Sequence, residues 1–152
     1  MVMPVGAASP HILLVEDDED DRTIFLRAAE RSGMRAKIQV AADGEAALAQ
    51  LHGASGILKS DRRACVVLLD LNMPGMSGFD LLARIRGAQE TRTLPVIVLT
   101  TSDNMEDVMK CYELGANSFI TKPAQLDELI DVVSEIDRYW FGLVTLPSLP
   151  AQ

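Results

Sequence analysis

Five short apolar runs alternate along the chain with segments of helical periodicity, and this alternation constrains the fold more than any other feature. The runs lie at residues 12–15, 37–41, 65–69, 96–99 and 118–120. Runs that are apolar at nearly every position are typical of strands buried on both faces, as in a parallel sheet covered by helices. The second run alternates polar and apolar residues instead, which indicates an edge strand. Five such units in order predict an α/β fold with an open, doubly wound sheet and right-handed crossovers.

The segments between the runs carry the signals of helices. One begins with acidic residues and ends at Gly33, as the helix dipole and the left-handed C-cap favour. In two others, which start at Met105 and Leu126, apolar residues recur at i, i+3, i+4 and i+7 and mark one helix face. Five helices are therefore predicted, within residues 20–33, 43–53, 77–87, 105–112 and 126–133.

Length and charge limit the classes of protein that the chain fits. With 152 residues, 48% of them apolar, it matches one globular domain with a proper core. Its net charge of −8 argues against nucleic-acid binding, which requires a basic surface. No apolar run reaches the roughly 18 residues of a membrane span, and the first residues lack the pattern of a signal peptide. We therefore expect a cytoplasmic protein that binds neither nucleic acid nor membrane.

Three regions are expected along the chain. Residues 1–9 are interpreted as a loose N-terminal tail and residues 10–140 as the domain itself. Two prolines in residues 141–152 prevent a helix from continuing, so this C-terminal tail is predicted to be extended. Within the domain, residues 53–64 form a rather long polar connection.

Polar and charged side chains follow four of the five predicted strands. The first strand ends in Glu16 and Asp17, the third in Asp70, the fourth in Thr100 and the fifth in Lys122. Open parallel sheets bind ligands beyond the carboxyl ends of their strands, so these side chains are expected to converge. Three neighbouring carboxylates repel one another, and a hard divalent cation such as Mg²⁺ is the common remedy. With a lysine and a hydroxyl to contact phosphate oxygens, the set predicts metal-assisted phosphoryl transfer to an aspartate.

Simpler interpretations exist for several of these residues. The acidic run continues through residues 18–21, where we interpret it as a solvated helix start rather than part of a site. Taken alone, Thr100 would be an ordinary strand-end threonine and Lys122 a surface lysine. Their coincidence at successive strand ends is what favours a built site.

Four motifs follow one another within residues 10–138: ILLVEDD, VVLLDLNMPGMSGFDLL, LPVIVLTTS and GANSFITKP. In this order and spacing they resemble the receiver domains of bacterial two-component response regulators. The resemblance implies a flavodoxin-like sheet of five parallel strands in the order 2-1-3-4-5, with five helices. It also implies a signalling protein rather than an enzyme.

The resemblance implies a metal and phosphoryl site at the strand ends. Asp70 would be the phosphoacceptor, which receives a phosphoryl group from the histidine of a kinase. Asp17 would bind Mg²⁺ directly and Glu16 would act through water. The carboxylate of Asp70 and the backbone carbonyl of Asn72 would complete the metal ligands that the protein supplies.

The same resemblance implies a switch. Thr100 would be the hydroxyl that moves toward the phosphate, and Lys122 would bind a phosphate oxygen. Phe119 occupies the position of the family's switch aromatic, without a tyrosine hydroxyl. The peptide bond between Lys122 and Pro123 would be cis.

The end of the chain extends the resemblance. YWFGLVTLP at residues 139–147, together with the long 53–64 connection, is similar to the small stand-alone regulators that work with phytochrome-type histidine kinases. The last helix also carries a second apolar stripe, and a helix with two apolar faces needs a second surface to cover it. We expect a homodimer through this helix and tail; the alternative is that the tail folds back over the stripe. The residues assigned to the interface are Val132, Ile136, Tyr139, Trp140 and Leu143.

Two other functions fit parts of the pattern. A haloacid-dehalogenase-type phosphatase also uses an aspartate after a strand with Mg²⁺, but its second acid is replaced here by Asn72, and no cap domain fits. A phosphorylation-independent adaptor would keep the fold alone, and the intact set of site residues argues against it. No output domain is expected after the receiver, so its output is predicted to be protein–protein contact or phosphate relay.

Overall fold

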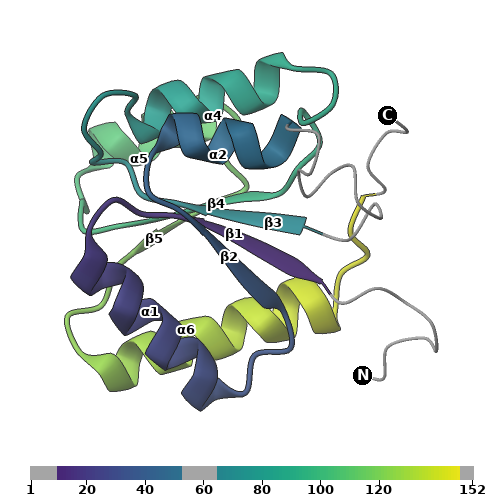
Figure 1. Cartoon of the computed structure of the whole chain (residues 1–152). Coiled ribbons are helices and arrows are strands. Elements are labelled where there is room, and N and C mark those ends of the chain that lie inside the picture. Colours follow the sequence, from purple (N-terminus) through teal and green to yellow (C-terminus); the bar gives the residue numbers. More distant parts are fainter. Residues whose placement is uncertain (1–9, 53–64, 148–152) are drawn as a thin grey trace.

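The computed structural model describes residues 10–52 and 65–147, which form a parallel sheet between two layers of helices (Figure 1). Five strands pair in the order β2-β1-β3-β4-β5, and all neighbouring pairs are parallel. This confirms the predicted fold and strand order. The predicted N-terminal tail, the 53–64 connection and residues 148–152 lie outside the described residues. The strands are β1 (His11–Val15), β2 (Lys37–Ala41), β3 (Cys65–Leu69), β4 (Val96–Thr100) and β5 (Ser118–Thr121).

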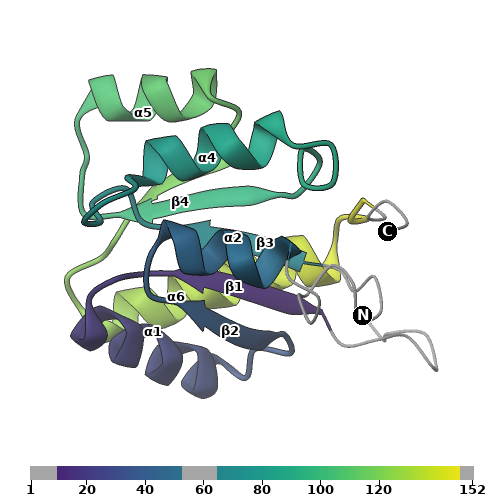
Figure 2. The same cartoon turned by 45° about the horizontal axis from the view of Figure 1, so that its top comes forward.

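The described residues contain five α-helices, which divide between the two faces of the sheet. Figure 1 shows α2, α4 and α5 on one face and α1 and α6 on the other. In the turned view of Figure 2, α4 lies between α2 and α5. No helix in this part of the chain has the length and apolar character to cross a membrane. The helices are α1 (Glu19–Ser32), α2 (Gly44–His52), α4 (Gly78–Gly87), α5 (Met105–Glu113) and α6 (Leu126–Ile136).

The sequence sets several of the helix ends by side-chain and glycine caps. Asp18 caps α1, because its carboxylate accepts a hydrogen bond from the backbone N–H of Asp21 at 2.9 Å. The same helix ends at Gly33, whose φ of 71° is the left-handed conformation that glycine adopts without strain. Ser77 and Asp80 form a reciprocal capping box at the start of α4. These caps fix where α1 and α4 begin beside the carboxyl ends of the strands.

The three central strands are buried on both faces, as their unbroken apolar runs predicted. Along β1, Leu13 and Val15 pack toward α2 and α4, while Ile12 and Leu14 pack toward α1 and α6. The same alternation in β3 and β4 creates two cores that share one sheet. The edge strands β2 and β5 are only partly buried, and the predicted edge position of β2 is confirmed.

The end of α6 corrects part of the predicted interface. The core face of this helix carries Leu129, Val133 and Ile136, and Ile136 is only 4% exposed. A five-residue π-helical turn, Asp137–Phe141, then follows. A π turn delays the helical phase by about one residue, so Phe141, rather than Trp140, falls on the core side.

Ile136 therefore belongs to the core of the single chain and not to an exposed stripe; its inclusion in the interface is wrong. The other members of the predicted stripe keep an outward position. Tyr139 and Leu143 are exposed, while Val132 and Trp140 are partly buried against the core. Arg35 fixes the helix end, because its guanidinium donates to the carboxylate of Asp137 at 3.3 Å.

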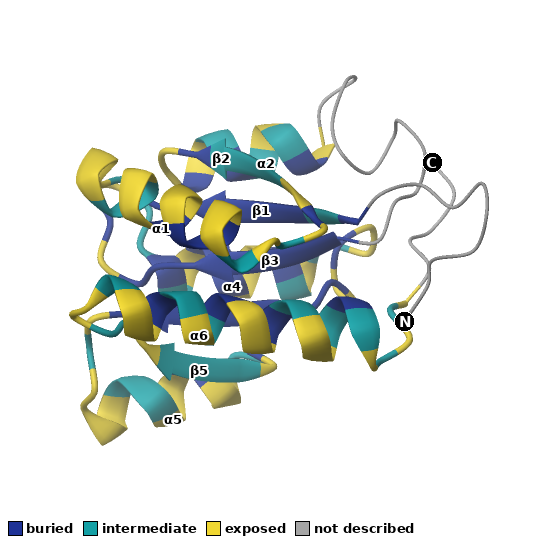
Figure 3. Ribbon diagram, turned by 90° about the horizontal axis from the view of Figure 1, so that it is seen from below, coloured by how far each residue is buried: buried dark blue, intermediate teal, exposed yellow. Residues whose placement is uncertain are grey.

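The apolar stripe predicted within residues 105–112 does form a helix, but most of it faces solvent. Met105, Met109 and Tyr112 are all at least 48% exposed, whereas Cys111 is buried under the helix. An amphipathic helix that turns its apolar face outward leaves that face free to contact another protein. The helix stands at the β5 side of the molecule (Figure 3).

Candidate functional site

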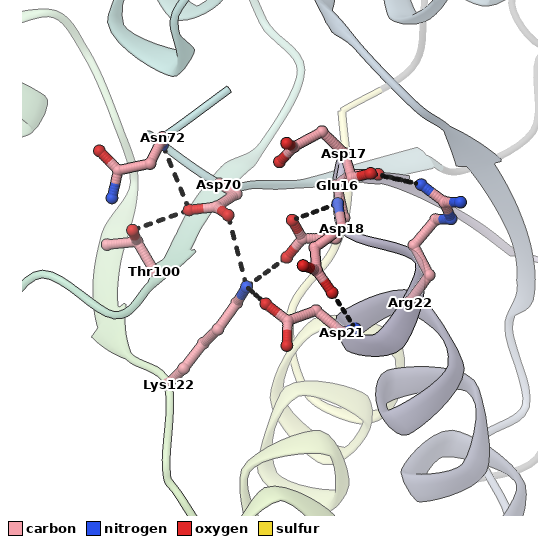
Figure 4. Close-up of polar contacts among 9 residues, drawn as sticks. All are labelled: Glu16, Asp17, Asp18, Asp21, Arg22, Asp70, Asn72, Thr100 and Lys122. Atoms are coloured by element: carbon pink, nitrogen blue, oxygen red, sulfur yellow. Dashed lines mark hydrogen bonds and ion pairs between the residues drawn. The ribbon is translucent and has the colours of Figure 1, made fainter. Parts of the chain in front are cut away.

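The site lies where the carboxyl ends of four strands meet (Figure 4). Glu16 and Asp17 follow β1, Asp70 follows β3, Thr100 is the last residue of β4, and Lys122 follows β5. Parallel register brings these positions to one edge of the sheet, although up to 106 residues separate them along the chain. The structure thus brings together all five side chains that the sequence placed at the strand ends.

Asp70 is held by contacts to both of its carboxylate oxygens. Its Oδ1 accepts a hydrogen bond from the hydroxyl of Thr100 at 2.8 Å and a longer one from the backbone N–H of Asn72 at 3.4 Å. Its Oδ2 lies 3.4 Å from Nζ of Lys122. Both Asp70 and Thr100 are buried, so little water competes for these contacts.

The backbone of Asp70 is held by the start of α4. A Cβ atom placed on Gly78 would lie 2.4 Å from the carbonyl oxygen of Asp70 and 2.7 Å from Cα of Leu71. Only glycine allows this approach, and the N–H of Gly78 donates to the carbonyl of Leu71 at 3.0 Å. The helix start therefore closes the loop that carries the aspartate.

Three carboxylates converge beside this contact. Glu16, Asp17 and Asp70 each offer an oxygen, and the three oxygens lie within 4.8 Å of one another. Carboxylate oxygens at this spacing are the donors that Mg²⁺ and other hard divalent cations take. The carbonyl of Asn72, predicted as a further ligand, belongs to the loop directly after Asp70, and the Asn72 side chain is exposed. The residues present fit a divalent cation that would neutralise the carboxylates and draw a phosphoryl oxygen toward them.

A guanidinium holds the acidic loop in place. Nη1 of Arg22 donates to the backbone carbonyls of Glu16 at 3.0 Å and Asp17 at 2.9 Å. Two carbonyls that share one donor must point the same way, which orients the loop between β1 and α1. The sequence does not identify Arg22, because its role depends on how closely α1 approaches the preceding loop, and no sequence motif indicates that.

Lys122 reaches three carboxylates at once. Its Nζ forms ion pairs with Glu16, with Asp21 at 3.1 Å and with Asp70 at 3.4 Å. The interpretation of residues 18–21 as a merely solvated helix start is therefore incomplete. Asp21 lies in the first turn of α1, directly after the loop that carries Glu16 and Asp17, and this closeness in sequence is the signal that places it near the site.

Burial and charge change the acidity of the central pair. Burial raises the pKa of Glu16 to about 7, against the opposing effects of the hydrogen bond and charge of Lys122, and the charge of Asp70 raises it further. For Lys122, burial works to lower the pKa, but the hydrogen bond to Glu16 and the charges of Asp70 and Glu16 raise it overall. The raised pKa of Lys122 keeps the lysine charged, while burial makes ionisation of Glu16 costly even beside that lysine.

The predicted switch residues lie along β4 and β5. Phe119 pairs in register with Val98 and is partly buried against the core below α4 and α5. The end of β4 is tied to the segment that follows β5, since the N–H of Lys122 donates to the Thr100 carbonyl at 2.7 Å. The prediction of a cis bond before Pro123 is wrong, because the described residues contain no cis peptide bond.

A family model for the response regulator receiver domain matches residues 12–134 of the chain. The chain belongs to the response regulator receiver family. The resemblance inferred from the four motifs is therefore confirmed, and with it the assignment to two-component signalling. The homologues are signalling proteins rather than typical enzymes.

Several relatives match over nearly the whole receiver chain. The response regulator Rcp1 of Synechocystis is 37% identical over 137 residues, which cover 90% of this chain and 92% of Rcp1. A probable methanogenesis regulatory protein, FilR2 of Methanothrix harundinacea, is 39% identical over 131 residues, with 86% and 83% covered.

Solved structures of related response regulators also resemble this chain over nearly its whole length. The Mn²⁺-bound form of Rcp1 superposes with a TM-score of 0.78 at 37% identity, covering 91% of this chain and 99% of that one. The phosphorylated form of RcpA, a cyanobacterial phytochrome response regulator, gives a TM-score of 0.82 at 35% identity, with 93% and 100% covered. These two proteins thus pair the same fold with a divalent cation in one case and a phosphoryl group in the other.

Proposed function

We propose that this protein is a single-domain response regulator that accepts a phosphoryl group from a histidine kinase on Asp70, with Mg²⁺, and then changes its protein contacts. The observation that carries the proposal is the position of the Asp70 carboxylate. It lies between the hydroxyl of Thr100 and the ammonium of Lys122, within reach of two further carboxylates. The likeness to the phosphorylated RcpA structure supports the same role.

In the proposed reaction, an oxygen of Asp70 forms a bond to phosphorus as the bond from phosphorus to the kinase histidine breaks. Glu16, Asp17, Asp70 and the carbonyl of Asn72 would hold Mg²⁺, which supplies positive charge for the phosphoryl oxygens. Lys122 adds a second positive charge, with its Nζ 3.4 Å from Oδ2 of Asp70. Every group needed to stabilise an anionic phosphoryl group is then provided by four strand ends.

The switch is proposed to be a shift between two arrangements of the α5 side of the molecule. Phosphate oxygens on Asp70 would offer new partners to Thr100 and Lys122, and so favour the arrangement in which Thr100 lies closer to the phosphate. Phe119 would turn inward with it. The exposed apolar face of α5 and the outer side of α6 are the proposed output surfaces, where the changed contacts occur.

The partners proposed are a phytochrome-type histidine kinase and a second copy of the chain, in the cytoplasm. The kinase type rests on the likeness to RcpA and on the matching C-terminal segment. The dimer rests on Tyr139 and Leu143, which are exposed, and on Val132 and Trp140, which line a groove of about 640 Å³ beside β5.

The first experiment is the intact mass of the protein after incubation with acetyl phosphate and Mg²⁺. A single phosphoryl adduct is expected on the wild type and not on Asp70→Asn, nor on wild type treated with a chelator. If no adduct forms, binding of a beryllofluoride mimic distinguishes a short-lived phosphoryl group from none. Failure of both would contradict the proposal and favour a phosphorylation-independent adaptor.

The dimer is tested by light scattering on Leu143→Glu. Because Leu143 is exposed in the single chain, the substitution should halve the measured mass without unfolding the domain. Leu26→Glu introduces the same charge at an exposed position on α1 and should leave the mass unchanged. Equal masses for both variants and the wild type would remove this surface from the proposed interface.

A further inference from the structure

Lys122 pairs with three carboxylates, and a bound divalent cation would neutralise some of them but not all. Glu16 and Asp70 belong to the acidic trio, so a divalent cation would take up much of their charge. Asp21 does not belong to the trio, although its Oδ2 lies 3.1 Å from Nζ of the lysine. With the cation bound, Asp21 would be the ion-pair partner of Lys122 that keeps its full negative charge.

The position of Asp21 is fixed by its helix rather than by the site. It lies in the first turn of α1, and its backbone N–H is held by the capping carboxylate of Asp18. Its side chain is 43% exposed, while that of Lys122 is 15% exposed. Asp21, Asp70 and Lys122 all border one cavity of about 510 Å³ beside the strand ends. An anion bound to Asp70 within this cavity would therefore lie close to Asp21.

We propose that Asp21 is a positioning residue that holds Lys122 on the α1 side of the cavity and competes with the phosphoryl group for it. The inference rests on the proposed function, since it concerns the phosphoryl group on Asp70. In the structure the ammonium lies nearer to Asp21 than to Asp70, at 3.1 Å against 3.4 Å (Figure 4). Phosphorylation must therefore draw the lysine away from a partner that it already has.

Asp21 weakens phosphate binding at the site in two ways. Its carboxylate shares the hydrogens of the Lys122 ammonium, which leaves fewer for phosphoryl oxygens. Its negative charge also repels an anionic phosphoryl group that occupies the same cavity. Both effects lower the affinity of the site for phosphate and leave the acidic trio unchanged. Asp21 thus limits how strongly the phosphorylated state is stabilised.

The test compares Asp21→Asn with Asp20→Asn in the full chain. Asp20 lies in the same helical turn and is exposed, so its substitution removes an equal charge without touching the Lys122 pair. Affinity for beryllofluoride is measured at saturating Mg²⁺ by ¹⁹F NMR, and affinity for Mg²⁺ alone by calorimetry. Because pairs with a partly exposed member contribute modestly, Asp21→Asn should bind the mimic about two- to fivefold more tightly than Asp20→Asn. The Mg²⁺ affinities of the two variants should agree, and Asp21→Glu should return the mimic affinity to that of the wild type.

Each other outcome overturns a specific idea. Equal mimic affinities for the two asparagine variants, or weaker binding by Asp21→Asn, would refute the competition while leaving Asp70 as phosphoacceptor. Parallel changes in mimic and Mg²⁺ affinity would assign Asp21 to the metal site instead. A wild type that binds no beryllofluoride and forms no adduct with acetyl phosphate would refute the proposed function and this inference together.

Discussion

The close approach of α4 to the phosphoacceptor loop predicts a large effect for Gly78→Ala. The added Cβ would meet the Asp70 carbonyl oxygen at 2.4 Å and Leu71 Cα at 2.7 Å, and both are backbone atoms. Ordinary contacts at such positions begin near 3.4 Å, so helix and loop must separate by roughly 1 Å. Overpacking of this kind costs about 1–3 kcal/mol, and the gain in helix propensity from alanine, below about 1 kcal/mol, offsets only part of it.

Gly87→Ala is the matched control, because it makes the same substitution at the other end of α4. A Cβ on Gly87 would meet nothing within 4 Å, so this variant should be neutral or slightly more stable than the wild type. Urea unfolding in metal-free buffer measures both free energies of unfolding. Calorimetry should also show weaker Mg²⁺ binding by Gly78→Ala, since the displaced loop carries Asp70. Two variants of equal stability would refute the role assigned to this contact.

Three further predictions concern the site and the last helix. Thr100→Val should lower the free energy of unfolding by about 1–3 kcal/mol in metal-free buffer, because the buried carboxylate of Asp70 loses its shortest hydrogen bond; a change below about 0.5 kcal/mol would contradict this. Mg²⁺ at ten times its Kd should stabilise the protein by about 1.4 kcal/mol, visible as a higher Tm, and Asp17→Asn should need more Mg²⁺ for the same shift. Ile136→Glu should cost at least about 3 kcal/mol of unfolding free energy because it buries an unpaired charge, whereas Leu143→Glu should cost little; similar losses would mean that Ile136 is not a core residue.

The sequence predicted the parts of the structure that depend on local pattern. The runs predicted all five strands, and in the central three, burial on both faces leaves no polar position to obscure the run. The strand-end residues were predictable for a related reason. A carboxylate such as Asp70 directly after a buried run has to lie at the sheet edge, wherever its partners come from.

The missed features depend on contacts between distant segments or on a change of helical phase. The sequence indicates a solvated position for Asp21, because nothing local points to its partner Lys122, which is 101 residues away. Ile136 fits both the core series that starts at Leu129 and the outer series that starts at Val132, so periodicity alone could not assign it. The π turn that brings Phe141 rather than Trp140 to the core side has no sequence signal of its own.

The two-sided burial of the central strands determines which part of the sheet can move most easily when the site changes. Strands β1, β3 and β4, which lead to the acidic residues and Thr100, are packed between helices on both faces of the sheet. Among the strands that end at the site, only β5, which leads to Lys122, is half-open to solvent. A phosphoryl group added to Asp70 would therefore displace the tightly packed strands β1, β3 and β4 less easily than β5. For the proposed switch, β5 is therefore the strand of the site whose packing resists displacement least.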